Sequence, residues 1–160
     1  MRILALLLIA VPCALGLAHD RSTKQPFTIQ ITADSPTVKS GSAVGIEVLI
    51  KNTSSEPLSC SGNISSLTGQ DPHFRFDVRD THGNLVPKRV YPHPELAEGH
   101  PIMDCTIRQG ETRAESQDVA RIIDLTRPGK YVIQMFRIIS ATNEKAGEVG
   151  SNKITVTVIP

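Results

Sequence analysis

Apolar and polar side chains alternate along much of the chain. In residues 27–32, Phe27, Ile29 and Ile31 alternate with threonine and glutamine. This period of two is typical of a strand with one buried face. The same period recurs strongly in residues 44–52, 73–80, 131–136 and 152–160, and weakly in residues 85–90, 106–108 and 111–119. The pattern therefore predicts about seven strands and almost no helix.

Proline and glycine separate these segments. Gly83-Asn84 is suited to the positive φ of a hairpin turn, and Pro87 limits residues 85–90 to an edge strand. Pro128-Gly129 predicts a tight reversal, in which proline presets φ and glycine takes the positive φ that follows. Residues 33–42 read as a turn, residues 91–104 as a long loop, and residues 120–125 as one helical turn or a corner.

About seven short strands joined by such turns predict an all-β fold, an antiparallel β-sandwich of immunoglobulin-like type. Tyr131, at the start of its strand, would bury its ring and turn its hydroxyl back onto the preceding connection, as a corner tyrosine does. Pro128, Gly129 and Tyr131 would together form this structural corner. The predicted inner faces consist of Ile29, Ile31, Ile46, Val48, Phe74, Phe76, Ile133, Ile154 and Val156.

The N-terminus has the pattern of a secretory signal. Arg2 precedes an apolar run, and Gly16 and Ala18 place small residues before a cut after Ala18. We expect residues 1–18 to be a cleaved signal peptide, residues 19–26 a flexible lead-in, and residues 27–160 the folded domain. A retained N-terminal anchor is the alternative. The expected location is the periplasm or the medium, and we expect no membrane insertion after cleavage.

Charge narrows the range of partners. The whole chain has a formal net charge of +1, and loss of Arg2 with the signal brings it to about zero. Nucleic-acid binding needs a basic face, so no nucleic-acid partner is expected.

Cys60 and Cys105 would be the two cysteines of the mature chain. In an exported protein such a pair is most simply a disulfide. It would close a loop of about 45 residues and stabilise the fold by roughly 3–4 kcal/mol. Two free thiols, or a soft metal site shared with a histidine, are the alternatives.

Several turns also carry a family resemblance. These are NTSSEPL at 52–58, FDVRDTHGNLVP at 76–87, RQGET at 108–112 and DLTRPGKYVIQM at 124–135. In this series the chain resembles exported bacterial immunoglobulin-like domains of uncharacterised function. It is more distantly similar to the domain family named after an intracellular proteinase inhibitor of bacilli. The resemblance covers roughly residues 27–159 and implies the fold; proteinase inhibition follows only from that family's name.

One candidate for metal chemistry lies at the mature N-terminus. A terminal His19 would offer an α-amine and an imidazole, which is half of a copper site. His93, His100 and Met103 are further candidate binding residues, although their spacing matches no known metal motif. Titration of Cu(II) into protein that begins at His19 would separate this alternative from the others.

No catalytic motif stands out, and we expect a protein that is not an enzyme and needs no cofactor. Phe136, on the outward face of its strand, either lines a contact surface or joins a small cluster under the 90–105 loop. The sequence favours a module that binds an unknown protein or cell-surface partner, through loops at 54–70 and 90–105. A copper-binding accessory protein and a proteinase inhibitor are the alternatives.

The cysteine pair gives a direct test. We expect native protein, assayed without reductant, to show no reactive thiol, and to show two after unfolding and reduction. Thiol titration of the purified mature protein measures both numbers. Two thiols that react before reduction would exclude the disulfide.

Overall fold

The computed structural model describes residues 25–59, 74–90, 106–139 and 147–160. Nearly all the regular structure in these ranges is extended, as the alternation predicts. The elements are β1 (Phe27–Ala33), β2 (Thr37–Lys39), β3 (Gly45–Asn52), β4 (Leu58–Ser59), β5 (Phe74–Arg79), β6 (Thr106–Ile107), β7 (Thr112–Asp118), the 3₁₀ helix η2 (Val119–Arg121), β8 (Gly129–Ile139) and β9 (Gly147–Ile159).

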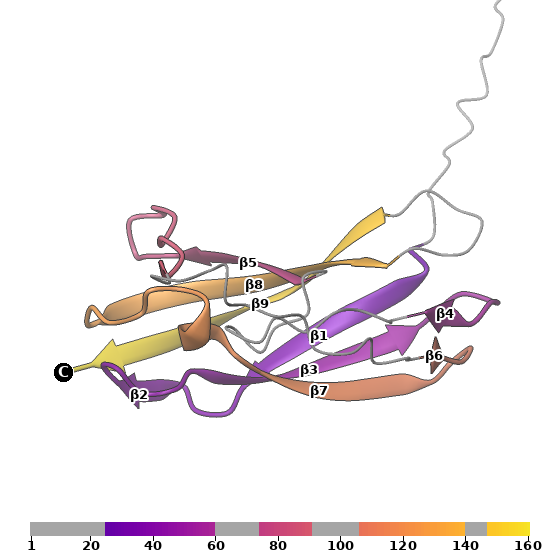
Figure 1. Ribbon diagram of the computed structural model, residues 1–160, viewed down its shortest axis with the longest axis horizontal. Coiled ribbons are helices and arrows are strands. Elements are labelled where there is room, and N and C mark those ends of the chain that lie inside the picture. Colours follow the sequence, from indigo (N-terminus) through magenta and orange to yellow (C-terminus); the bar gives the residue numbers. More distant parts are fainter. Residues whose placement is uncertain (1–24, 60–73, 91–105, 140–146) are drawn as a thin grey trace, which may run out of the picture.

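Two sheets pack face to face (Figure 1). One has the strand order β1-β3-β7 and the other β2-β9-β8-β5, while β4 and β6 form a small ribbon. The pairs are antiparallel except for β2 with β9, which is parallel. The orders β1-β3-β7 and β5-β8-β9 correspond to strands A-B-E and C-F-G of an immunoglobulin domain. The fold is therefore an immunoglobulin-like β-sandwich, as predicted.

The parallel strand β2 lies within a segment that the sequence assigns to a turn. Its middle residue, Val38, is partly buried against the core. The backbone N–H of Ser40 donates to the carbonyl of Ile159 at 2.7 Å, and the N–H of Thr157 donates to Pro36 at 2.9 Å. Pairing with β9, rather than a local period, makes these three residues a strand.

Two predicted turns differ from expectation. Gly129 is not a positive-φ residue; it begins β8 and pairs with Val158. The strand starts earlier than the Pro-Gly pair suggests, so the chain reverses before Pro128. Gly83 does have a positive φ of 82°, whereas Asn84 does not. Residues 85–90 form no strand and make only isolated bridges, because Pro87 has no N–H for a ladder.

The core matches the predicted inner faces. Eight of the nine predicted residues are buried, and Ile154 is partly buried and packs against the others. Leu58 and Ile107 of the β4–β6 ribbon extend the core, and so do Val119 and Ile123 of the corner after β7. Burial of apolar side chains on both inner faces holds the two sheets together.

An arginine also lies in this core. Arg137 continues the inward positions of Tyr131, Ile133 and Met135 along β8, and it is only 1% exposed. Its guanidinium lies 4.2 Å from the centroid of the Phe74 ring, and its Nη1 lies 3.7 Å from Oε2 of Glu115. Because β7 and β8 belong to different sheets, this ion pair crosses the sandwich.

A β-bulge in β9 places a side chain that makes a second contact between the two sheets. The register shifts between Gln134 and Phe136, so that Ser151 and Asn152 both oppose Met135. The N–H of Met135 donates to Oγ of Ser151 at 3.0 Å. The Asn152 side chain then reaches the outer edge of β1, where it accepts from the N–H of Ile31 at 2.8 Å and donates to its carbonyl at 3.0 Å.

This tie can be tested by stability. Asn152→Ala leaves a partly buried N–H and C=O of Ile31 without their partners, so we expect a loss of about 1–3 kcal/mol in the free energy of unfolding. Chemical denaturation measures it. The matched control is Lys153→Ala, an exposed neighbour in β9, expected to change stability by less than about 0.5 kcal/mol. Equal stability of the two variants would contradict the role of Asn152.

Candidate functional site

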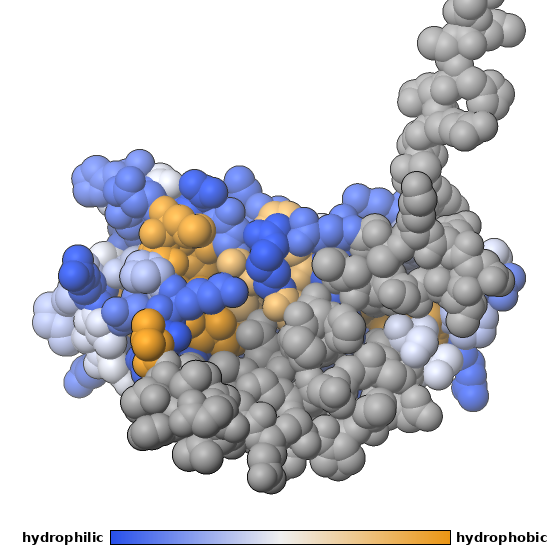
Figure 2. All heavy atoms as spheres, turned by 45° about the horizontal axis from the view of Figure 1, so that its top comes forward, coloured by the Kyte–Doolittle hydropathy of each residue, from blue (hydrophilic) through white to orange (hydrophobic). Residues whose placement is uncertain are grey.

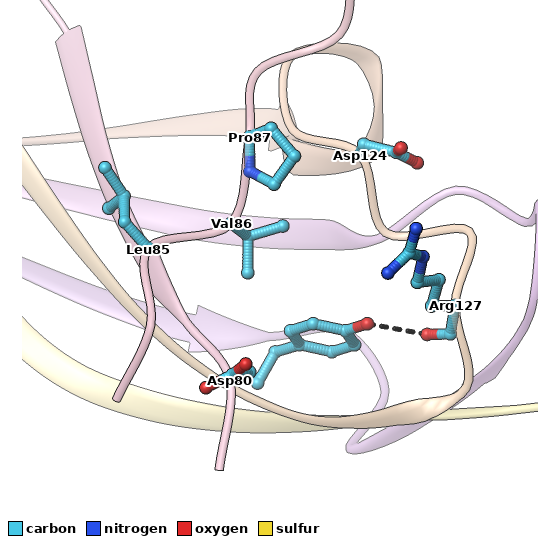
Figure 3. Close-up of a pocket in the computed structure, with 7 residues that line it drawn as sticks. Asp80, Leu85, Val86, Pro87, Asp124 and Arg127 are labelled. Atoms are coloured by element: carbon cyan, nitrogen blue, oxygen red, sulfur yellow. Dashed lines mark hydrogen bonds between the residues drawn. The ribbon is translucent and has the colours of Figure 1, made fainter. Parts of the chain in front are cut away.

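A pocket of about 260 Å³ opens where the turn after β5 meets the corner before β8. Backbone bonds bring these two distant segments together: Arg89 donates to Ile122 at 2.8 Å, and Asp124 donates to Pro87 at 3.0 Å. The lining residues are Asp80, Leu85, Val86, Pro87, Asp124, Arg127 and Tyr131 (Figure 3).

Tyr131 forms one wall of the pocket. Its ring is buried, and its hydroxyl donates to the carbonyl of Arg127 at 2.6 Å, which fixes the connection that precedes β8 (Figure 3). This is the bond expected of a corner tyrosine. Burial, with a smaller contribution from the charge of Asp124, raises the pKa of Tyr131 above its usual value. The phenol is therefore neutral and acts as a hydrogen-bond donor.

Asp80 organises the turn after β5. Its Oδ1 accepts the N–H groups of His82 at 2.8 Å and Asn84 at 2.9 Å, and its Oδ2 accepts the Asn84 side chain at 3.1 Å. The hydrogen bonds from Asn84 are the main reason that the pKa of Asp80 lies below its usual value. The carboxylate is thus an anion that fixes the turn immediately before Leu85.

Asp124 has the corresponding role in the corner before β8. Its Oδ1 accepts the hydroxyl of Thr126 at 2.6 Å and the N–H of the same residue at 3.2 Å. These bonds, with a smaller effect of the positive Arg89 and Arg127, lower the pKa of Asp124. Figure 3 shows the Arg127 guanidinium directed toward Asp124.

The rim of the pocket is apolar. Leu85 is 63% exposed, and Val86 and Pro87 continue the wall beside it. Figure 2 shows apolar side chains at the surface among hydrophilic ones, on the left of the molecule. The site combines a small apolar surface with two ionised carboxylates and one guanidinium, a lining suited to binding.

Phe136 lies elsewhere, on the outer face of the four-stranded sheet. Its ring is partly buried, 4.1 Å from the Arg75 guanidinium, which also makes two hydrogen bonds of 3.0 Å with Glu148. On its other side, a Cβ at Gly150 would lie 3.0 Å from the ring, so any larger residue there would crowd Phe136. The ring is thus packed between β5 and β9 rather than in the corner pocket.

Most of the other sequence-predicted site residues lie outside the described residues. These are His19, Cys60, His93, His100, Met103 and Cys105. Within the described ranges, no group of three or more His, Cys, Asp or Glu residues could hold a metal ion. The described part of the chain also contains no helix long and apolar enough to cross a membrane.

The sequence reasoning missed Asp80, Leu85, Asp124 and Arg127 as site residues. A signal for the two aspartates was present, since each begins a short turn motif: Asp80 stands three residues before Gly83, and Asp124 two before Thr126. Their convergence on one pocket depends on the tertiary fold, which no local motif encodes.

Comparisons with known proteins give likenesses of fold. No family model and no curated protein matches the chain. A crystal structure of the CARDB domain of PF1109 from Pyrococcus furiosus, in complex with di-metal ions, shares 13% identity over 83% of this chain and 87% of that chain, with a TM-score of 0.42. A solution structure of the same domain has a TM-score of 0.39 at 13% identity, covering 84% and 94% of the two chains. The alkylpurine DNA glycosylase AlkC of Pseudomonas fluorescens follows at 12% identity and a TM-score of 0.37, over 79% of this chain and 30% of that chain.

The corner tyrosine gives a test by pH. Tyr131→Phe removes the bond to Arg127, so we expect a loss of about 1 kcal/mol at neutral pH. Because the folded-state pKa is raised, this tyrosine favours the folded state below about pH 10, and its contribution is lost as pH rises through the folded pKa.

We therefore expect the stability difference between wild type and Tyr131→Phe to shrink above about pH 10. Denaturation curves at neutral and alkaline pH measure this difference. Tyr91 is present in both proteins, so its ionisation contributes equally to both stabilities and drops out of the difference. A difference that stays constant into the alkaline range would contradict this role.

Proposed function

We propose that this chain is an exported, non-enzymatic immunoglobulin-like module that binds a partner protein through the surface around the corner pocket. The observation that carries the proposal is Leu85, a large apolar side chain that is 63% exposed at the rim of a pocket with charged walls. An apolar centre within a polar rim is the usual anatomy of a protein-binding surface.

The polar groups around Leu85 fit that anatomy. Asp80 and Asp124 are held ionised by turn hydrogen bonds, and Arg127 and Tyr131 line the same pocket. Such groups give an interface its specificity and orientation. The surface also rests on elements tied by backbone bonds from Arg89 and Asp124, so little conformational freedom would be lost on binding.

The state of the carboxylates supports a binding role over a catalytic one. A general acid or base works best with a pKa near the working pH. Here the pKa values of Asp80 and Asp124 are displaced downward, away from neutrality, by bonds that stabilise the turns. Both groups therefore act as fixed anions.

One of the two loops expected to contact a partner, residues 90–105, begins near this surface. Val90 is 93% exposed and stands on the same connection as Leu85, at the start of the 90–105 segment. Export is proposed on the signal pattern of residues 1–18. The copper-binding and inhibitor alternatives depend on His19 or on a family name, and the described residues do not favour them.

A photo-crosslinking residue in place of Leu85 tests the proposal in cells of the source organism. We expect a discrete adduct with one partner protein in the fraction outside the cytoplasm. A second substitution, Leu85→Lys in the wild-type background, should weaken binding of that partner by about tenfold or more, because it places a charge at the apolar centre.

The matched control is Val132, an exposed aliphatic residue that lies outside the pocket lining. The same photo-crosslinker at Val132 should give no such adduct, and Val132→Lys should leave binding unchanged. Identical adducts from the two positions, or none from position 85, would contradict the proposed surface.

A further inference from the structure

The four edge strands of the sandwich differ in how their outer edges are covered. The outer edge of β1 is held by Asn152. β2 has only three residues and ends at Lys39. Along β5, the returning chain pairs through Val86 to Val78 and through Asp80 to Asn84. Short length, a lysine and covering segments are known protections against edge-to-edge pairing.

Strand β7 is the exception. It runs for seven residues at the border of its sheet, and none of the described strands lies beyond it (Figure 1). The N–H of Val119 donates to Val44, and the N–H of Asn52 donates to Glu111, both at 3.0 Å. Since bonded pairs alternate along an antiparallel ladder, Arg113, Glu115 and Gln117 are the residues that bond to β3.

The backbone groups of Thr112, Ala114 and Ser116 therefore point away from β3. Within the part of the chain that the structure describes, no hydrogen bond reaches them. Their side chains are exposed, small and uncharged, and β7 contains no proline or lysine and pairs with β3 without a bulge. Among the described residues, no strand pairs with this edge, which leaves its backbone groups available to a further strand.

The inward-facing side chains determine which strand can pair there. Arg113 and Glu115 lie partly buried on the inner face, with Arg113 Nε 3.0 Å from Glu115 Oε1. Charges facing inward at an edge oppose the addition of an apolar strand. They accept a strand that presents opposite charges at the facing positions.

We propose that the occupant is a second copy of this chain, with the two β7 strands antiparallel about a two-fold axis at Ala114. In this register each Arg113 faces the partner's Glu115. A two-fold axis one residue away would oppose two glutamates or two arginines, and an axis at Ser116 would pair neither charge with its opposite. The axis at Ala114 is thus the one that pairs the two inward charges of β7, Arg113 and Glu115, with each other.

The pairing joins two sandwiches into one continuous sheet. The facing residues Thr112, Ala114 and Ser116 would supply about six backbone hydrogen bonds. The interface uses no residue of the corner pocket, so it adds an assembly to the proposed function and does not depend on it.

Cysteine crosslinking tests the register. At the two-fold axis the two Ala114 Cα atoms would be about 5.5 Å apart, within disulfide range. The two Ser116 Cα atoms would lie about 14 Å apart, beyond that range. We expect Ala114→Cys to form a covalent dimer under mild oxidation at least about tenfold faster than the matched Ser116→Cys. Equal rates, or no dimer from Ala114→Cys, would overturn the proposal.

Sedimentation tests the assembly itself. Ala114→Pro removes an N–H that points outward and leaves the bonds to β3 intact, so the fold should persist, as circular dichroism would verify. We expect wild type to dimerise, with an affinity that falls as the salt concentration rises. The dimer affinity of Ala114→Pro should be at least about tenfold lower than that of wild type. Wild type that stays monomeric to about 1 mM would overturn the proposal. If Ala114→Pro does not fold, the comparison of Ala114→Cys with Ser116→Cys decides.

Discussion

The amide group of Asn152 ties the edge of one sheet to the other sheet. Apolar burial presses the sheets together, but it does not satisfy the backbone groups at the sides of each sheet. Asn152 satisfies both groups of Ile31, and it reaches them because the bulge at Ser151 re-aims the strand. Ser151 in turn accepts the N–H of Met135, so that the bulge leaves this donor paired. One side of the sandwich is closed by this arrangement, while β7 borders the other.

Hydrogen bonds that stabilise the fold also shape the corner pocket. Asp80 and Asp124 each fix a turn by accepting nearby N–H and hydroxyl groups, and Tyr131 fixes the connection before β8 through its bond to Arg127. These are structural interactions, yet together they place Leu85 at the surface beside a charged wall. The proposed binding surface is therefore a by-product of how the fold makes two of its turns.

The sequence predicted the strands whose alternation is long and self-contained, such as β1, β3 and β5, and the residues that they bury. It failed where a partner distant in sequence decides the conformation. Val38 belongs to a strand only because β9 lies beside it, and Gly129 is extended only because Val158 pairs with it. Arg137 could have been found by extending the period beyond Met135. For the site, the turns that begin at Asp80 and Asp124 are visible in the sequence. The backbone bridge between Lys88 and Ile123, which brings the two turns to one pocket, is not.

The position of β9 in the topology has a consequence for the order of assembly. This strand lies between β2 and β8 and also holds β1, although it is the last strand of the sequence. A chain that emerges N-terminus first must carry β1 and β2 without their partner until residues 147–159 are free to pair. Sandwich closure is thus a late, non-local event, and such topologies fold slowly. A nascent or truncated chain lacking this segment would keep the apolar faces of β1 and β2 exposed, and would therefore be a substrate for chaperones until β9 pairs.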